Sequence, residues 1–311
     1  MTARMFYITV LFVMMALLSP DPGHAAGKVI AAIMSSDQPR YREAHRAFVK
    51  SLGGHGYTPA TTEIILQVPN PDPLSWSNTI RKFNAYRPDL IVAYGAPAAL
   101  VAMKEAVGIP VVSVDMYASE RPQRGTCGVS SRVPMITLLK TMQDIRPFRK
   151  VGVMYNQREA GSHRQTEDVR KAALQLGTHV IDINVSSAAA VDSALTSVLN
   201  DVDVLVLTES GIVSRQFDRI IARAKARNIP VIATMPDAAI KGALVSLEIN
   251  PQEQGQMAAE VAQRLLGGEK ADALSLLAPR RIDMVINMKV AHDLGITIPF
   301  PVLSNATRIL K

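Results

Sequence analysis

Apolar runs rich in β-branched residues alternate with helical segments along nearly the whole chain. KVIAAIM (residues 28–34), DVLVLT (203–208) and IPVIATM (229–235) are examples of these runs, and segments with apolar residues at helical spacing separate them. Strands that alternate with helices in this way are typical of βαβ units and parallel sheets. The sequence therefore predicts an α/β fold.

The alternating series occurs twice. Residues 88–115 and residues 202–235 share one layout, in which a strand, a turn, a helix, an Ile-Pro pair and a β-branched strand follow one another. This repetition predicts two similar doubly wound parallel-sheet lobes, with the strand ends of both lobes at a shared cleft. One continuous sheet of about ten strands is the alternative, and it is less common for a chain of this length.

Two stretches suggest where the chain crosses between the lobes. The first is RPF (146–148), and the second is LLAPRRIDMVIN (276–287), where Pro and Arg interrupt the pattern. Such crossings would form a hinge that lets the lobes close around a ligand. The predicted lobes are an N-terminal lobe of residues 26–147 plus roughly 277–293, and a C-terminal lobe of residues 148–276 plus roughly 294–311.

The N-terminus has the features of a secretory signal peptide. Arg4 is positively charged, residues 5–18 are uncharged and apolar but too few to span a membrane comfortably, and small residues precede position 26. We expect residues 1–25 to be removed and the mature protein to be periplasmic, the alternative being a retained signal anchor. The only cysteine, Cys127, lies far from the cleavage site, so a lipoprotein is not expected.

Composition argues against several classes of function. The net charge of +7 comes from dispersed basic residues such as Arg40, Arg42 and Arg46, which we expect on solvated helix faces rather than on a nucleic-acid-binding surface. One cysteine and six scattered histidines form no recognisable metal site. The G-x-S-x-G, G-x-G-x-x-G and G-x-x-x-x-G-K-[ST] motifs are absent. We therefore expect a monomeric, non-enzymatic protein without metal or cofactor.

The stretch PDLIVAYGAPAALVA (88–102) carries the first candidate site. A strand stops at Tyr94-Gly95 and a helix follows, which exposes the helix N-terminus at the strand end where ligands bind in open α/β sheets. Gly95 permits close backbone approach, and Pro97 suits the first helical turn. We expect Gly95, Ala96, Pro97 and Ala98 to bind an anionic group such as a carboxylate through main-chain N–H groups. An ordinary turn that binds only water is the alternative.

Acidic residues at other strand ends suggest a partner for a positive group. Asp115 ends one predicted strand and Glu209 follows another. Either carboxylate could pair with a ligand ammonium, or could instead cap a helix or form a surface ion pair. An anion site at one end of the cleft and an acidic site at the other would suit an amino-acid-like ligand.

Further candidates rest on position alone. Asn156 either contacts the ligand or stabilises its own turn, and Tyr94 either stacks on a flat ligand or packs at the edge of a domain. Three residues after the first strand contact the ligand or else cap the helix that begins near Arg40: Ser35, Ser36 and Asp37.

Several motifs occur in an order and spacing that point to one family. The stretches are Tyr94–Ala99, GVMYNQREAGS (152–162), Glu209-Ser210-Gly211 and MVINMKVAHDLGITIP (284–299). Together they resemble the substrate-binding proteins of ABC importers, specifically the group related to tryptophan- and tyrosine-binding components. The resemblance implies a type I periplasmic binding protein fold. It also adds Glu159, Ser210 and Gly211 to the candidate ligand-binding residues.

The resemblance implies a periplasmic solute-binding component that delivers its ligand to an ABC permease in the inner membrane. Ala96 lacks the hydroxyl that the family usually places there, and Glu209-Ser210 replaces an Asp-Asn pair. The cargo is therefore expected only to be a small polar molecule, amino-acid-like or a carboxylate. A ligand-binding subunit of a sensor receptor and an exported enzyme built on the same lobes are the alternatives.

Overall fold

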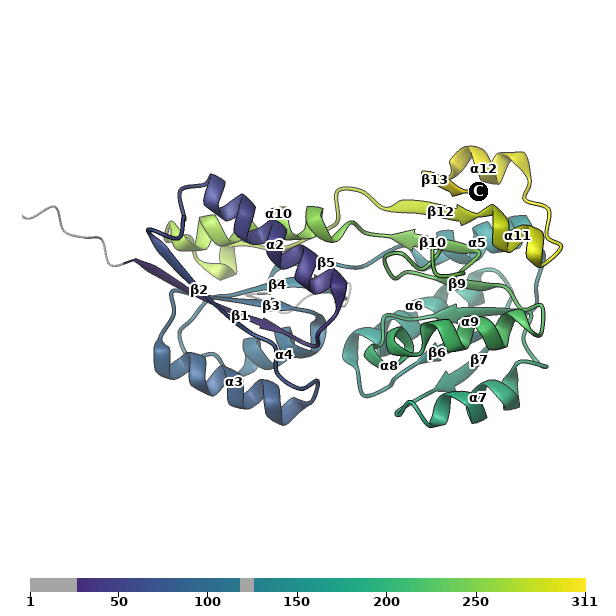
Figure 1. Cartoon of the computed structure of the whole chain (residues 1–311), viewed down its shortest axis with the longest axis horizontal. Helices are drawn as coiled ribbons and strands as arrows, with labels where there is room; N and C mark the ends of the chain where they lie inside the picture. The colour runs from purple at the N-terminus through teal and green to yellow at the C-terminus, as the bar shows by residue number, and fades with distance from the viewer. Residues whose placement is uncertain (1–26, 118–125) are drawn as a thin grey trace, which may run out of the picture.

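Two lobes lie side by side along the long axis of the molecule (Figure 1). The structure, a computed structural model, describes residues 27–117 and 126–311. The expected signal peptide, residues 1–25, lies outside the described residues. Each lobe has its own sheet with helices on both faces, as the alternating pattern predicts.

The first lobe is built on a sheet with the strand order β11-β5-β4-β3-β1-β2. Its strands are β1 (Lys28–Met34), β2 (Thr62–Gln67), β3 (Leu90–Tyr94), β4 (Val111–Met116), β5 (Cys127–Ser130) and β11 (Leu276–Leu277). All of their pairings are parallel. Because helices cover both faces, the central strands are apolar throughout, and every residue of β3 is buried.

Within the described residues, four helices cover this first sheet. They are α2 (Pro39–Gly54), α3 (Pro73–Tyr86), α4 (Ala96–Glu105) and α10 (Pro251–Leu266). Phe48 of α2 and Met257 of α10 pack on the face that carries Ile30, while Ile80 of α3 packs on the face that carries Ile33. Alternate residues of β1 thus enter opposite cores, as the two-residue period of a strand requires.

The second lobe contains a sheet with the order β13-β12-β10-β9-β8-β6-β7. Its strands are β6 (Lys150–Tyr155), β7 (His179–Asn184), β8 (Val204–Leu207), β9 (Val231–Ala233), β10 (Val245–Glu248), β12 (Asp283–Asn287) and β13 (Arg308–Leu310). Strand β12 runs antiparallel to β10, and the other pairings are parallel. The surrounding helices are α5 (Met135–Ile145), α6 (Ala160–Gln175), α7 (Ala190–Val198), α8 (Gly211–Arg215), α9 (Phe217–Lys225), α11 (Met288–Asp293) and α12 (Phe300–Asn305).

The chain crosses between the lobes at three places within the described residues: between β5 and α5, between β10 and α10, and between β11 and β12. The predicted lobe boundaries are therefore wrong. Residues 135–145 pack in the second lobe, residues 251–266 pack in the first, and residues 283–287 pair within the second sheet rather than the first. The apolar stripe of α10 identifies a buried face, but its spacing does not say which of two sheets covers that face.

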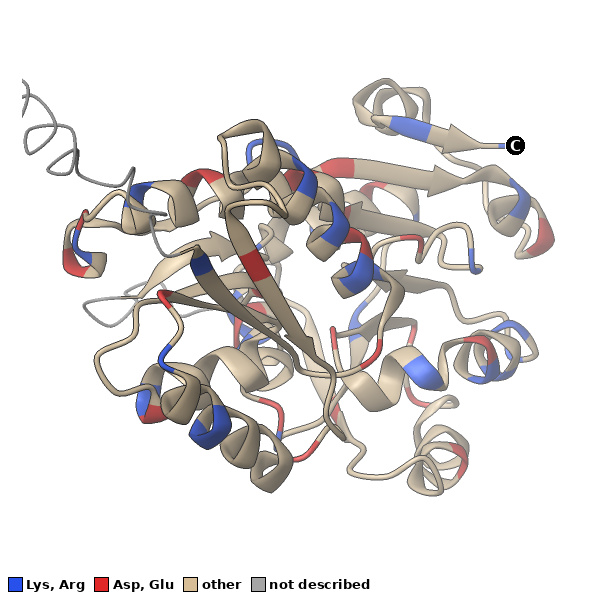
Figure 2. Cartoon of the chain, turned by 60° about the vertical axis from the view of Figure 1, so that its left-hand side comes forward, with Lys and Arg blue, Asp and Glu red and all other residues tan. Residues whose placement is uncertain are grey.

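Acidic and basic residues are interspersed along the chain in both lobes (Figure 2). Arg42 and Arg46 are exposed on α2, as predicted, whereas Arg40 at the start of the same helix is largely buried. Among residues 27–117 and 126–311, no helix is long and apolar enough to cross a membrane.

Helices α2 and α10 approach each other unusually closely at Gly255. A Cβ atom added there would lie 2.1 Å from the carbonyl oxygen of Ala44. Backbone cannot move aside as a flexible side chain can, so this contact requires glycine. The packing of a late helix of the chain against an early one depends on it.

We expect Gly255→Ala to lower the free energy of unfolding by about 1–3 kcal/mol, because the methyl group overpacks the interface between α2 and α10. Urea unfolding followed by circular dichroism measures this change. Gly54→Ala is the matched control, since it lies in α2 with no atom within 4 Å of an added Cβ. Equal stability of the two variants would contradict the prediction.

Candidate functional site

A cavity of about 410 Å³ lies between the lobes, at the carboxyl ends of their parallel strands. This is the position at which open α/β sheets bind ligands. The predicted site residues that line it are Ser35, Ser36, Ala96, Pro97, Asp115, Asn156, Glu159, Glu209 and Gly211. The cavity thus brings together residues that the sequence places up to 176 positions apart, from Ser35 to Gly211.

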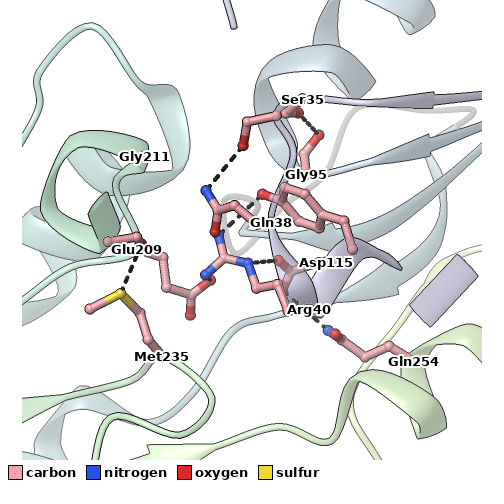
Figure 3. Close-up of polar contacts among 12 residues, drawn as sticks. Ser35, Gln38, Arg40, Gly95, Asp115, Glu209, Gly211, Met235 and Gln254 are labelled. Carbon is pink, nitrogen blue, oxygen red and sulfur yellow. Dashed lines mark hydrogen bonds and ion pairs between the residues drawn. The ribbon is translucent and has the colours of Figure 1, made fainter. Parts of the chain in front are cut away.

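An ion cluster made of Arg40, Asp115 and Glu209 lies in the cavity wall. Arg40 Nε lies 3.1 Å from Asp115 Oδ2, and Arg40 Nη1 lies 3.9 Å from Glu209 Oε2. Arg40 and Asp115 belong to the first lobe, and Glu209 follows β8 in the second. Figure 3 shows the guanidinium of Arg40 between the two carboxylates. The three side chains are each about one-tenth exposed or less, so their charges are poorly screened by water.

The local backbone geometry places the side chain of Asp115 in this cluster. Asp115 has a φ of 56°, in the left-handed region that few residues other than glycine adopt. It lies in an irregularity of the pairing between β4 and β5, where the register shifts between Ser113 and Met116. A bulge of this kind redirects a side chain. Gln254 of α10 supports the result by donating a hydrogen bond of 3.4 Å to Asp115 Oδ1.

Burial makes the charge of Glu209 unfavourable. Burial has the largest effect on the pKa of Glu209 and raises it to about 8, and repulsion from Asp115 acts in the same direction. The charge of Arg40, a hydrogen bond from Thr234 and the nearby amide of Gln165 act in the opposite direction. Burial acts to lower the pKa of Arg40. Interactions with Tyr41, Asp115 and Glu209 have the larger combined effect, so the pKa of Arg40 is raised above its usual value. Arg40 therefore stays positive, while Glu209 can hold a proton near neutral pH.

Glu159 organises the rim of the second lobe. Its carboxylate accepts hydrogen bonds from Gly211 N at 2.8 Å, Ser210 Oγ at 3.0 Å and Asn156 Nδ2 at 2.9 Å. These contacts connect the loop after β6 to the start of α8. Ser210 is fully buried and caps α8 by accepting from Ile212 N at 3.2 Å. Ser210 therefore positions the loop and does not line the cavity.

The turn at Gly95–Ala98 differs from its expected role. Ser35 Oγ accepts a hydrogen bond of 3.0 Å from Ala98 N and donates one of 3.1 Å to Gly95 O. Ala98 is fully buried, and neither it nor Gly95 lines the cavity. Gly95 has a φ of 88°, and an added Cβ would lie 2.4 Å from the hydroxyl oxygen of Tyr41. Gly95 thus leaves room for the side chains of Tyr41 and Ser35. The Ala98 N–H, which was expected to bind an anion, donates to Ser35 instead.

Two other predicted residues point away from the cavity. Tyr94 is fully buried, and its hydroxyl lies 3.0 Å from Nδ1 of His45. Asp37 is exposed and pairs with Arg42, with 2.8 Å between Oδ2 and Nη2. Neither residue lines the cavity. Tyr94 belongs to the core because the last residue of β3 still faces helix α2.

The cavity also contains residues that were not predicted: Arg40, Trp76, Tyr117, Ser131 and Gln165. Arg40 directly follows Pro39 at the start of a helix that leads away from a strand end, and that position was the available signal. Ser131 directly follows β5, a short strand that the pattern did not distinguish. Gln165 and Trp76 lie on helices, where no strand-end rule applies.

Buried polar atoms without a hydrogen-bond partner gather at this cavity. In the described part of the chain they are Arg40 Nε, Asp115 Oδ2, Ser131 Oγ, Gln165 Nε2 and His163 Nδ1. All but His163 belong to residues that line the cavity; Arg40 Nε and Asp115 Oδ2 form an ion pair that lacks hydrogen-bond geometry. Because buried polar groups are normally satisfied, Ser131 Oγ and Gln165 Nε2 are the exceptional atoms of this wall.

The chain matches a model of the ABC transporter substrate binding protein family over residues 23–310. It belongs to that family. This confirms the resemblance that the sequence motifs suggested. Members of the family are binding components, and the residues of this chain that the structure describes include no group of three or more His, Cys, Asp or Glu placed to hold a metal ion.

Individual relatives share less than a quarter of their aligned residues with this chain. The chain is 23% identical to a tyrosine-binding protein of Clostridioides difficile over 262 residues, which cover 81% of this chain and 76% of that protein. A conserved domain protein of Vibrio cholerae has a TM-score of 0.85, with 23% identity over 91% of this chain and 99% of that one. A streptococcal ABC domain in complex with L-Trp also has a TM-score of 0.85, with 20% identity over 91% and 100%. These structures confirm the two-lobed type I fold.

The lobes touch beside the cavity at Gly161, near the start of α6. An added Cβ would lie 3.5 Å from the Cβ atoms of both Ala96 and Tyr117 in the other lobe. Tyr117 also donates a hydrogen bond of 2.8 Å to Asp168 of α6. A methyl group fits at position 161, but a longer side chain does not fit while the lobes remain in contact.

We expect Gly161→Leu to hold the lobes apart and Gly161→Ala to leave them in contact. The radius of gyration measured by small-angle X-ray scattering should therefore be larger for the leucine variant than for the alanine variant, each measured without ligand. Circular dichroism verifies that both variants are folded. Identical scattering from two folded variants would show that the contact at Gly161 does not limit the approach of the lobes.

Proposed function

We propose that this protein is the periplasmic solute-binding component of an ABC importer and that it binds an amino-acid-like ligand in the cavity between its lobes. The observation that carries this proposal is the buried ion cluster, in which Arg40 of the first lobe lies between Asp115 and Glu209. We expect residues 1–25 to direct export and to be removed. The mature chain then delivers its ligand to a permease in the inner membrane.

The charge of the cluster favours a ligand with an ammonium group. Two carboxylates, Asp115 and Glu209, share a single guanidinium, so the cluster lacks one positive charge when both are ionised. A ligand ammonium supplies that charge and donates to carboxylate oxygens, an arrangement that makes strong hydrogen bonds. Protonation of Glu209 is the alternative that the protein itself can use, and it is available because the pKa of Glu209 is raised.

Part of the wall suits an apolar or aromatic side chain on the ligand. Trp76 and Tyr117 line the cavity from the first lobe, with Ile212 from the second. A tyrosine-binding relative and a structural neighbour in complex with L-Trp support the same class of ligand. Tyrosine and tryptophan are therefore the first ligands to test, even though the Asp-Asn pair of the family is replaced by Glu209-Ser210.

The position of the site between the lobes suggests how binding is signalled. Residues of both lobes contact the cavity, and three crossings connect the lobes. A ligand that contacts both walls stabilises the closed arrangement, which is the usual domain closure of two-lobed binding proteins. A permease that recognises the closed arrangement then receives only loaded protein.

A screen by thermal shift tests the proposed ligand class. We expect the mature chain, residues 26–311, to be stabilised by L-tryptophan or L-tyrosine, because a ligand that binds only the folded state raises the unfolding temperature. Other amino acids, small carboxylates, nucleosides, glucose and myo-inositol complete the panel. Stabilisation by a sugar and by no amino acid would contradict the proposal. Uptake of the bound ligand, compared between cells with and without this protein, tests the importer role.

The affinity for an ammonium-bearing ligand should depend on pH. Below about pH 8, Glu209 holds a proton for part of the time, since its pKa in the ligand-free protein is about 8. The ammonium pairs with the ionised form, so binding must release that proton. The dissociation constant for L-tryptophan should therefore fall as the pH rises from about 6 to about 8, by at most about tenfold per pH unit.

Isothermal titration calorimetry at several pH values measures this dependence. Glu209→Gln is the matched control, because it keeps the shape of the side chain and cannot ionise. Its affinity should be lower than that of the parent at pH 8 and nearly constant with pH. A parent protein whose affinity does not change between pH 6 and pH 8 would show that the ligand does not pair with Glu209.

A further inference from the structure

The proposed function requires a partner for the carboxylate of an amino acid, and the Gly95–Ala98 turn does not supply a convincing one. Ser35 already accepts from Ala98 N, and Pro97 has no N–H. The first turn of α4 therefore offers at most the Ala96 N–H. The carboxylate partner has to be found among donors that the protein leaves unused.

Gln165 is one such donor. It lies on α6 in the second lobe and is fully buried. Its Oε1 accepts a hydrogen bond of 2.7 Å from Glu209 N, which fixes the orientation of the amide and leaves Nε2 at the other end. Gln165 lines the cavity, and its Nε2 makes no hydrogen bond within the described part of the chain. Nε2 carries two hydrogens and can only donate.

Ser131 is the second unused donor, and it comes from the opposite lobe. It directly follows β5 and is 1% exposed. Its backbone N–H donates to Met116 O at 3.1 Å, which fixes the main chain. Its Oγ lines the same cavity and makes no hydrogen bond to residues 27–117 or 126–311.

We propose that Gln165 Nε2 and Ser131 Oγ bind the carboxylate of the ligand, so that the cavity recognises an amino acid as a zwitterion with one lobe supplying each donor. This inference rests on the proposed function and specifies the head group of its ligand. Both side chains are uncharged donors that are nine-tenths buried or more, and burying an unsatisfied donor is costly unless a ligand completes it.

The distribution of donors and acceptors favours a carboxylate at this position. Asp115 and Glu209 present acceptors, which suit an ammonium and repel an anion. Gln165 and Ser131 present donors, and Arg40 lies in the same wall with its positive charge. An ammonium cannot use Gln165 Nε2, since both groups only donate. A zwitterion satisfies both sets at once.

The test compares an amino acid with the amine that lacks its carboxylate. L-Tryptophan and tryptamine have the same ring and ammonium group, so the ratio of their dissociation constants reports the carboxylate alone. We expect the parent to bind L-tryptophan more tightly. In Gln165→Glu, which keeps Oε1 for Glu209 N and replaces the donor by an oxygen, L-tryptophan should bind about 10- to 100-fold more weakly, and tryptamine as tightly as before or more tightly.

Ser131→Ala provides a second, milder variant. It should weaken L-tryptophan binding by about 3- to 10-fold and leave tryptamine unchanged, because only one neutral hydrogen bond is removed. Ser197→Ala is the matched control, since Ser197 is exposed on α7 and does not line the cavity, and it should change neither affinity. Unfolding temperatures show whether each variant is folded.

The outcomes separate this inference from the proposed function. If both variants weaken amino acid and amine by the same factor, or weaken neither, the carboxylate is bound elsewhere, and the inference is wrong while the importer proposal stands. If the parent binds tryptamine as tightly as L-tryptophan, the cavity has no carboxylate site and the inference is also wrong. If the parent binds no amino acid, both proposals fail.

Discussion

The ion cluster of Arg40, Asp115 and Glu209 is the interaction on which the arrangement of the cavity depends. A buried guanidinium has to be paired, and the two carboxylates that pair with it come from different lobes. Asp115 reaches the cluster through a left-handed backbone and a break in register, and Gln254 of α10 supports it from behind. Removing Arg40 would leave two carboxylates without a counter-charge in the wall, whereas removing either carboxylate would leave a one-to-one pair. The cluster therefore connects the conformation of a strand end to the distance between the lobes.

The two walls of the cavity have different tasks. The loop after β6 and the start of α8 are held together by Glu159, which uses its carboxylate on Asn156, Ser210 and Gly211. These hydrogen bonds already satisfy the polar groups of that part of the site. The unsatisfied groups lie deeper, on residues of both lobes. In the proposed site, the choice of ligand depends on a few buried atoms such as Ser131 Oγ and Gln165 Nε2. The loops around Glu159 support them and have their own hydrogen bonds complete.

The alternation of strands and helices was sufficient to predict the two-lobed α/β fold, because each element has a strong period of its own. Lobe membership of α10 and β12 was not predictable in this way, since a buried stripe does not identify the sheet that covers it. Ser35, Asp115 and Glu209 were found because strand ends meet at one edge of a parallel sheet. Arg40 was missed because Arg42 and Arg46 on the same helix are ordinary surface residues. Gln165 lies in mid-helix, and only the three-dimensional arrangement shows that its amide faces a cavity.

The close contact of Gly255 with Ala44 has a consequence for how the chain acquires its structure during synthesis. The first sheet begins at residue 28, but its covering helix α10 ends at residue 266 and its edge strand β11 ends at residue 277. The sheet face that α10 covers therefore stays open until residue 266 has been made, although the opposite face of the same sheet is buried by residues 31–116. Long sequence separation of this kind slows folding. The packing of α10 on α2 is therefore one of the last contacts that the first lobe can make during synthesis.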